Sequence, residues 1–142
     1  MEYKYSDITE KIIGAAMKVH STLGNGFQEV IYQRALALQM EVDKISFIRE
    51  CNMPVLYLDQ QIGERRVDFF VHNKICVEIK AITNLEPVHF AQARNYLEAF
   101  NVEIGLLINF GSISLQFKRL SNPKYNPSKI HLPQNPSYLP KS

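Results

Sequence analysis

The chain has 142 residues, of which 46% are hydrophobic, and this length and composition suit one compact domain with a single core. Its formal net charge at pH 7 is only +2, so the strongly basic balance of many nucleic-acid-binding proteins is absent, although a local basic patch would fit this total. No apolar run approaches the roughly 20 residues that span a bilayer, and the N-terminus lacks a signal-peptide pattern, so we expect a cytoplasmic protein.

Two helices are predicted near the start of the chain. A helix-start signal at residues 6–10 leads into apolar residues at helical spacing, and this first helix ends near residue 24. The second helix is expected over residues 26–43, again with an apolar stripe. Glu29 and Tyr32 lie in its first turns, where an acidic side chain is ordinarily an exposed charge that the helix dipole stabilises.

Runs of β-branched and aromatic residues predict strands after these helices. Residues 45–49 and 55–58 form two short runs, and the proline between them indicates an edge strand or a bend. Two further runs, residues 67–71 and 75–79, flank a polar break at residues 72–74. This arrangement predicts two paired strands joined by a tight turn.

The predicted hairpin carries charged residues among its apolar ones. Side chains alternate across a strand, so Glu78 and Lys80 project from the same face. A three-residue loop pairs Asp68 with Glu78 and brings both acids to that face, whereas a two-residue loop would put them on opposite faces. Asn73 tolerates the left-handed conformation that the three-residue loop needs, and that register is therefore reasonable.

Two facing carboxylates repel each other, and removing each from water costs several kcal/mol unless a cation offsets the cost. One interpretation is structural: Lys80, or Arg66, which the same register places opposite Lys80, closes an ion-pair cluster around Asp68 and Glu78. The other interpretation is a divalent metal ion. Hard ions such as magnesium prefer oxygen ligands and keep several waters, so two or three carboxylates suit them. Both interpretations stay open at this point.

A third helix is predicted over residues 87–100, with a proline in its first turn. Besides an apolar stripe, this helix carries His89, Gln92 and Tyr96 in one polar file. In the absence of other information, such a file is a solvated helix face with one half-buried tyrosine.

The last third of the domain predicts two more strands and a tail. Residues 104–108 are continuously apolar, as expected for a strand that is buried on both faces and parallel to an earlier strand. Residues 113–118 alternate between apolar and polar side chains and predict a final half-exposed strand. We expect residues 1–120 to form the domain. Residues 121–142, which hold five of the seven prolines, should form an extended, peripheral tail without a helix.

Six motifs occur in order along the chain: HSTLG at residues 20–24, GFQEVIY at 26–32, RVD at 66–68, EIK at 78–80, HFAQ through a tyrosine at 89–96, and NFG at 109–111. Together they resemble the GxxExxY protein family, which is grouped with the PD-(D/E)XK nuclease superfamily. The resemblance covers residues 8–120 and implies an α/β fold with a mixed sheet and a restriction-endonuclease-like αβββαβ core in one domain. Val67 departs from the superfamily motif, which has proline at that position.

The resemblance also implies roles for individual residues. Asp68 and Glu78 match the principal metal-binding acids, Glu29 matches a glutamate that completes the metal shell, and Lys80 matches the catalytic lysine. Gln92 and Tyr96 match a motif on the following helix that lines the site. The set expected to bind substrate or support these groups is Tyr32, Arg66, His89, Gln92 and Tyr96.

The implied function is hydrolysis of nucleic-acid phosphodiester bonds with Mg²⁺ or Mn²⁺ as the cofactor. Asp68 and Glu78 would hold the metal ion, and Lys80 would orient the attacking water or stabilise the transition state. The substrate would be DNA or RNA, with no membrane partner, and a homodimer is compatible with so short a chain.

The alternative is a non-catalytic module on the same fold that binds nucleic acid or a protein partner. The weak net charge favours this alternative. The small size also favours it, because it leaves little room for a separate DNA-recognition domain. In this case the acids and Lys80 would be structural ion pairs.

Overall fold

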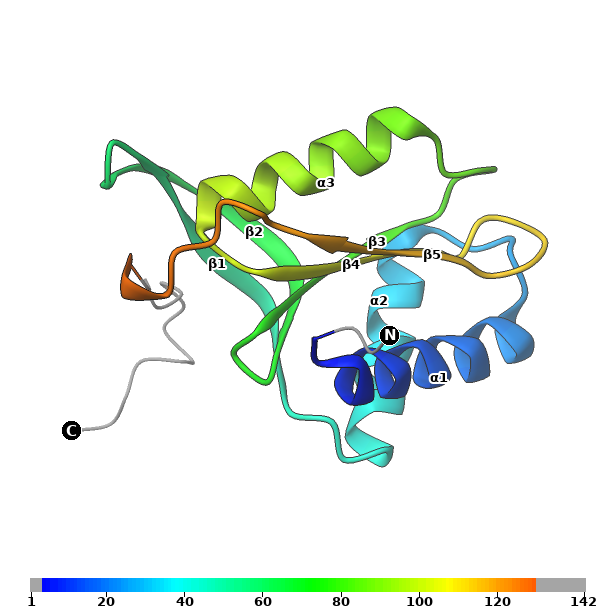
Figure 1. The fold of residues 1–142 in the computed structure, drawn as a ribbon. Helices are drawn as coiled ribbons and strands as arrows, with labels where there is room; N and C mark the ends of the chain where they lie inside the picture. The colour runs from blue at the N-terminus through cyan, green and yellow to red at the C-terminus, as the bar shows by residue number, and fades with distance from the viewer. Residues whose placement is uncertain (1–3, 130–142) are drawn as a thin grey trace.

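The computed structural model describes residues 4–129, which form three helices, five strands and one 3-10 turn (Figure 1). In chain order these are α1 Ser6–Leu23, α2 Glu29–Val42, β1 Phe47–Tyr57, β2 Gln60–Val71, β3 Ile75–Lys80, α3 Pro87–Phe100, β4 Ile104–Asn109, β5 Gln116–Ser121 and η1 Pro127–Lys129. None of the helices in the described residues is long and apolar enough to cross a membrane.

The strands form one mixed sheet in the order β1-β2-β3-β4-β5. β3 and β4 are parallel, and the other neighbouring strands are antiparallel. α1 and α2 cover one face of the sheet and α3 covers the other, so the described core has two layers of apolar contacts, one on each face (Figure 1). The predicted α/β class and the αβββαβ element order are therefore confirmed, with β5 added at the far edge.

Three strand boundaries differ from the prediction. The strand predicted over residues 67–71 begins earlier, at Gln60. Residues 45–49 and 55–58 belong to one strand, β1, which continues through Pro54. Proline is tolerated there because β1 is an edge strand of the described sheet and need not donate a ladder hydrogen bond on its open side. The last strand begins at Gln116 rather than residue 113, because Asn109 pairs with Gln116 and residues 110–115 form the connection.

The long β1–β2 hairpin is kinked near its middle. Glu50 has a left-handed backbone with φ 52°, and the pairing between the two strands skips Glu50 and Asp68. Alternation breaks at the same place: Val67 and Phe70, three residues apart, both pack in the α3-side core, whereas Phe69 packs on the other side. A left-handed conformation is costly for a residue with a Cβ atom, so this kink is a specific feature of the hairpin.

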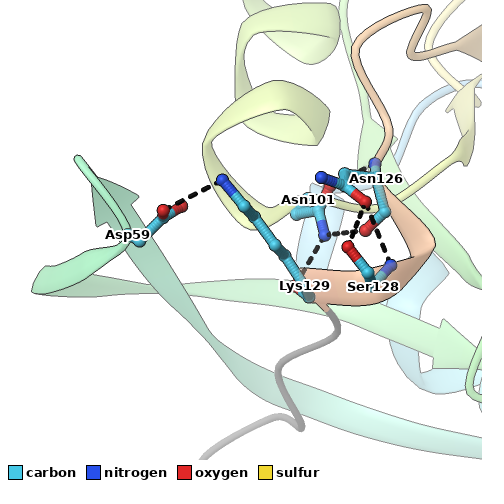
Figure 2. Close-up of polar contacts among 5 residues, drawn as sticks. All are labelled: Asp59, Asn101, Asn126, Ser128 and Lys129. Atoms are coloured by element: carbon cyan, nitrogen blue, oxygen red, sulfur yellow. Dashed lines mark hydrogen bonds and ion pairs between the residues drawn. The ribbon is translucent and has the colours of Figure 1, made fainter.

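Asparagine side chains attach the chain after β5 to the end of α3. The buried Asn122 donates to the carbonyl oxygens of Leu97 and Val102 at 3.2 and 3.1 Å. Figure 2 shows the second anchor, where Asn101 and Asn126 exchange hydrogen bonds of 2.9 Å.

The same segment also reaches the tip of the β1–β2 hairpin. Lys129 pairs there with Asp59 at 2.9 Å (Figure 2). Contrary to the expectation of a tail without a helix, η1 forms one 3-10 turn. The part of the predicted tail beyond residue 129 lies outside the described residues.

Candidate functional site

The site lies where β2 and β3 separate. Their pairing runs from Val71 and Ile75 to Phe69 and Val77, which is the register that the three-residue loop predicts, and it stops there. The next two residues in that register are Asp68 and Glu78. Asp68 Oδ2 accepts a hydrogen bond from the backbone N–H of Ile79 at 2.8 Å, so the carboxylate takes a main-chain donor where the ladder ends.

Asp68 is held from a second direction by α2. The side-chain amide of Gln33 donates to Asp68 Oδ1 at 2.7 Å, so both carboxylate oxygens accept a hydrogen bond. Gln33 is buried and stands one helical turn after Glu29. Sequence reasoning missed it, although its spacing from Glu29 puts both side chains on one face of the helix.

Burial and mutual repulsion raise the pKa values of two further acids. The pKa of Glu78 rises from 4.5 to about 8, first because the carboxyl is buried and second because Asp68 is near, while the Arg65 guanidinium partly offsets both effects. Burial also raises the pKa of Glu29, and Asp68 adds to the effect. The negative charge of Asp68 therefore acts on both Glu29 and Glu78, and a cation bound among the three acids would reduce this repulsion.

Arg65, which sequence reasoning also missed, is the arginine that faces these acids. Its Nη2 atom lies 3.4 Å from Glu78 Oε1, and its guanidinium carbon lies 4.1 Å from the centre of the Tyr96 ring. Arg66 instead lies 3.6 Å from Glu50. The predicted placement of Arg66 opposite Lys80 is not realised, because β2 leaves β3 before that point and the kinked hairpin turns its side chains.

α3 supplies the wall across from the two strands. Its polar file His89, Gln92 and Tyr96 faces the acids rather than bulk solvent alone. His89 also helps to begin the helix, since its Nδ1 atom accepts a hydrogen bond from the backbone N–H of Glu86 at 2.9 Å. The Tyr96 ring stacks on Phe100 with ring centres 6.0 Å apart, which ties the wall to the core.

Tyr32 is not among the residues that line the site. The side chain is fully buried, its hydroxyl donates to the Gly24 carbonyl oxygen and accepts from the Phe27 N–H, and its ring stacks on Phe110 at 4.7 Å. These contacts hold the turn before α2, where Gly24 has φ 75°. Tyr32 therefore positions the start of the helix that carries Glu29.

The remaining predicted residues line one hollow of about 170 Å³. They are Glu29, Arg66, Asp68, Glu78, Lys80, His89, Gln92 and Tyr96, and they are joined there by Arg65, Ile79, Ala93 and Leu107. The hollow is thus lined by three carboxyl groups, three cationic side chains and the polar file of α3.

The carboxylate oxygens of this hollow suit a hard cation as ligands, although they do not form a complete set of metal ligands. Within residues 4–129, no group of three or more His, Cys, Asp or Glu side chains stands ready to hold a metal ion. Asp68 is nevertheless close enough to Glu78 to help raise the pKa of the Glu78 carboxyl, and both side chains offer only oxygen ligands. Oxygen ligands with room for water are what magnesium and manganese prefer, so this pair fits such an ion and Glu29 stands nearby.

Comparison with known proteins gives two matches. A family model described as the PD-(D/E)XK nuclease superfamily matches residues 6–120, a range that includes the whole hollow. A solved structure described as "Crystal structure of SSO0001" has 16% sequence identity and a TM-score of 0.43, and the match covers 85% of this chain and 81% of that one. No curated protein matches the sequence.

Proposed function

This chain belongs to the PD-(D/E)XK nuclease superfamily, and from that premise we propose that it hydrolyses nucleic-acid phosphodiester bonds with the help of Mg²⁺ or Mn²⁺. One observation carries the proposal. Asp68 and Glu78 meet at the point where β2 and β3 separate, inside a hollow that Lys80 also lines. Buried acids that repel each other are unfavourable for folding, so their presence at such a point favours a function that uses a cation.

In this proposal each residue of the hollow has its own role in hydrolysis. Asp68 and Glu78 would hold the ion, and Glu29 would contribute from the start of α2. A bound divalent ion supplies positive charge for the phosphate and lowers the pKa of the attacking water. Gln33 and the Ile79 N–H keep the Asp68 carboxylate in one orientation. The Lys80 ammonium would donate hydrogen bonds to the phosphoryl oxygens as negative charge develops on them.

Within the superfamily, we assign the chain to the GxxExxY family. The spacing of Gly26, Glu29 and Tyr32 supports this assignment, and the structure gives the spacing a physical reason. Tyr32 braces the turn before α2, and that turn sets the position from which Glu29 enters the hollow. The proposal keeps residues 1–120 as the nuclease domain and residues 121–142 as its tail, in a cytoplasmic protein. Formation of a homodimer stays a prediction.

The alternative, a non-catalytic binding module, has one observation in its favour. Arg65 already places a cation beside Glu78, as a structural ion-pair cluster requires. Its contact is long for a hydrogen bond, however, and the pKa of Glu78 stays raised to about 8 in its presence. Arg65 therefore does not fully offset the effects of burial and of Asp68 on the Glu78 carboxylate, and we prefer the nuclease.

The test combines cleavage with metal binding. Purified protein is incubated with Mg²⁺ or Mn²⁺ and with single- and double-stranded DNA and RNA. The Asp68→Asn variant is run in parallel, and Glu41→Gln, an exposed acid of α2, is the matched control. We expect cleavage that Asp68→Asn abolishes and Glu41→Gln keeps. We also expect calorimetric heat of Mn²⁺ binding that disappears in Glu78→Gln. Intact strands in every form, together with no heat of Mn²⁺ binding, would exclude the nuclease.

A further inference from the structure

Arg65 is the charged residue of the hollow that the sequence motifs do not include. It lies on β2 beyond the kink at Glu50, and this position turns its side chain toward α3 and Glu78. The neighbouring Arg66 pairs with Glu50 instead and is the more exposed of the two. The strand distortion therefore selects which of two adjacent arginines faces the acids.

The guanidinium of Arg65 is held over an aromatic ring. It lies over the Tyr96 ring, 4.1 Å from the ring centre, and the ring in turn stacks on Phe100 in the core. A cation over an aromatic face is attracted by the electron density of the ring, and a stacked guanidinium loses much of its rotational freedom. Tyr96 therefore acts as a platform that fixes where the fork of the guanidinium points.

Most of the hydrogen-bonding capacity of Arg65 is still available. A guanidinium has five N–H donors, and within the described part of the chain Arg65 donates to Glu78 alone, at 3.4 Å. That distance is at the weak end of the range for a hydrogen bond, and 41% of the side chain is exposed. The remaining donors border an open hollow that already contains Lys80.

We propose that Arg65 grips a backbone phosphate of the nucleic-acid substrate, with Tyr96 as its platform and Glu78 as its resting partner in the free protein. The inference rests on the proposed nuclease function. Chemistry favours Arg65 over Lys80 for this task, because the planar fork of a guanidinium can donate two parallel hydrogen bonds to one phosphate. The same hydrogen bonds would replace the single long contact with Glu78, so binding a phosphate exchanges a weak partner for a stronger one.

Binding measurements separate this role from a structural one. Affinities for labelled DNA and RNA oligonucleotides are measured in calcium, which shares the preference for oxygen ligands, over a series of salt concentrations. The variants are Arg65→Met, Arg65→Lys and, as the matched control, Arg94→Met, an exposed arginine of α3 outside the hollow. Thermal melting of each variant confirms that it is folded.

We expect Arg65→Met to weaken binding about tenfold or more, because a charged hydrogen-bonded contact to phosphate is lost. The slope of log affinity against log salt should also fall, by about 0.7 for a single strand or about 0.9 for a duplex, since one fewer counterion is released. Arg65→Lys should keep most of the slope but lose part of the affinity. Tyr96→Leu should weaken binding in the wild-type background and have little further effect in Arg65→Met.

Two results would overturn the inference in distinguishable ways. If the wild type binds and cleaves nucleic acid while Arg65→Met keeps its affinity and salt slope, or loses no more than Arg94→Met, the role of Arg65 is wrong and the nuclease proposal stands. If the wild type neither binds nor cleaves any strand form, the proposed function fails and the role of Arg65 fails with it.

Discussion

Glu78 should make the free protein less stable as the pH rises, and a Glu78→Gln variant should remove that loss. The folded-state pKa of about 8 lies above the ordinary 4.5, so between these values folded Glu78 keeps a proton that the unfolded chain has released. The contribution of Glu78 to stability is therefore fully present below about pH 4.5 and is lost as the pH rises from there through about 8. Raising the pKa from 4.5 to about 8 corresponds to at most about 5 kcal/mol, since one pKa unit is worth about 1.4 kcal/mol.

Urea denaturation without divalent metal, at a series of pH values, measures this effect. Relative to the wild type, Glu78→Gln should gain about 4 kcal/mol of unfolding free energy between about pH 5 and pH 9. The amide can still accept a hydrogen bond from Arg65, so the comparison isolates the charge. Glu41→Gln, which removes an exposed charge from α2, should follow the wild-type curve. Parallel curves for Glu78→Gln and the wild type would refute the claim that burial and Asp68 together disfavour the Glu78 carboxylate.

Three further predictions concern a hydrogen bond to Asp68, a tightly packed glycine and a buried tyrosine hydroxyl. Gln33→Leu should weaken Mn²⁺ binding, measured by calorimetry, by about tenfold because Asp68 loses an orienting donor; unchanged affinity would contradict this. Gly111→Ala should cost about 1–3 kcal/mol in urea denaturation, because the added methyl group would overlap backbone atoms of the facing loop. Gly14→Ala, in α1, adds its methyl group to open space and should instead raise the free energy of unfolding by about 0.5–1 kcal/mol. Equal changes in stability for the two glycine variants would refute the packing argument. Tyr32→Phe should lower stability by about 1–3 kcal/mol, since a buried carbonyl oxygen and N–H lose their shared partner; a loss below the measurement error would contradict this.

The features that the sequence predicted well depend on local chemistry. The register of the β2–β3 hairpin follows from a three-residue loop, which Asn73 allows with its left-handed φ of 55°. In this register Asp68 and Glu78 are the next two opposed residues after the last pair, Phe69 and Val77. The fully apolar run of β4 indicated a strand between two layers, and all six of its residues are buried. Short-range patterns of this kind are decided by neighbours in the chain, so they can be recognised without coordinates.

The features that were missed depend on tertiary contacts. Nothing in the residue type of Glu50 indicates a left-handed backbone inside a strand, and without that kink Arg66 rather than Arg65 would face the acids. Gln33 looks like an ordinary polar residue of a helix until α2 is placed against Asp68. The alternating run at residues 113–118 fits a strand equally well when shifted, and only its pairing with β4 shows that β5 begins at Gln116.

We expect Asp68 and Glu78 to form the ion-binding centre of the hollow. Crystals of the protein grown with Mn²⁺ test it most directly, since the anomalous scattering of manganese locates the ion without reference to the protein chain. We predict a peak between these two carboxylates, on the side that faces Lys80 and α3. A peak elsewhere, or clear density for both carboxylates with no manganese beside them, would contradict the account.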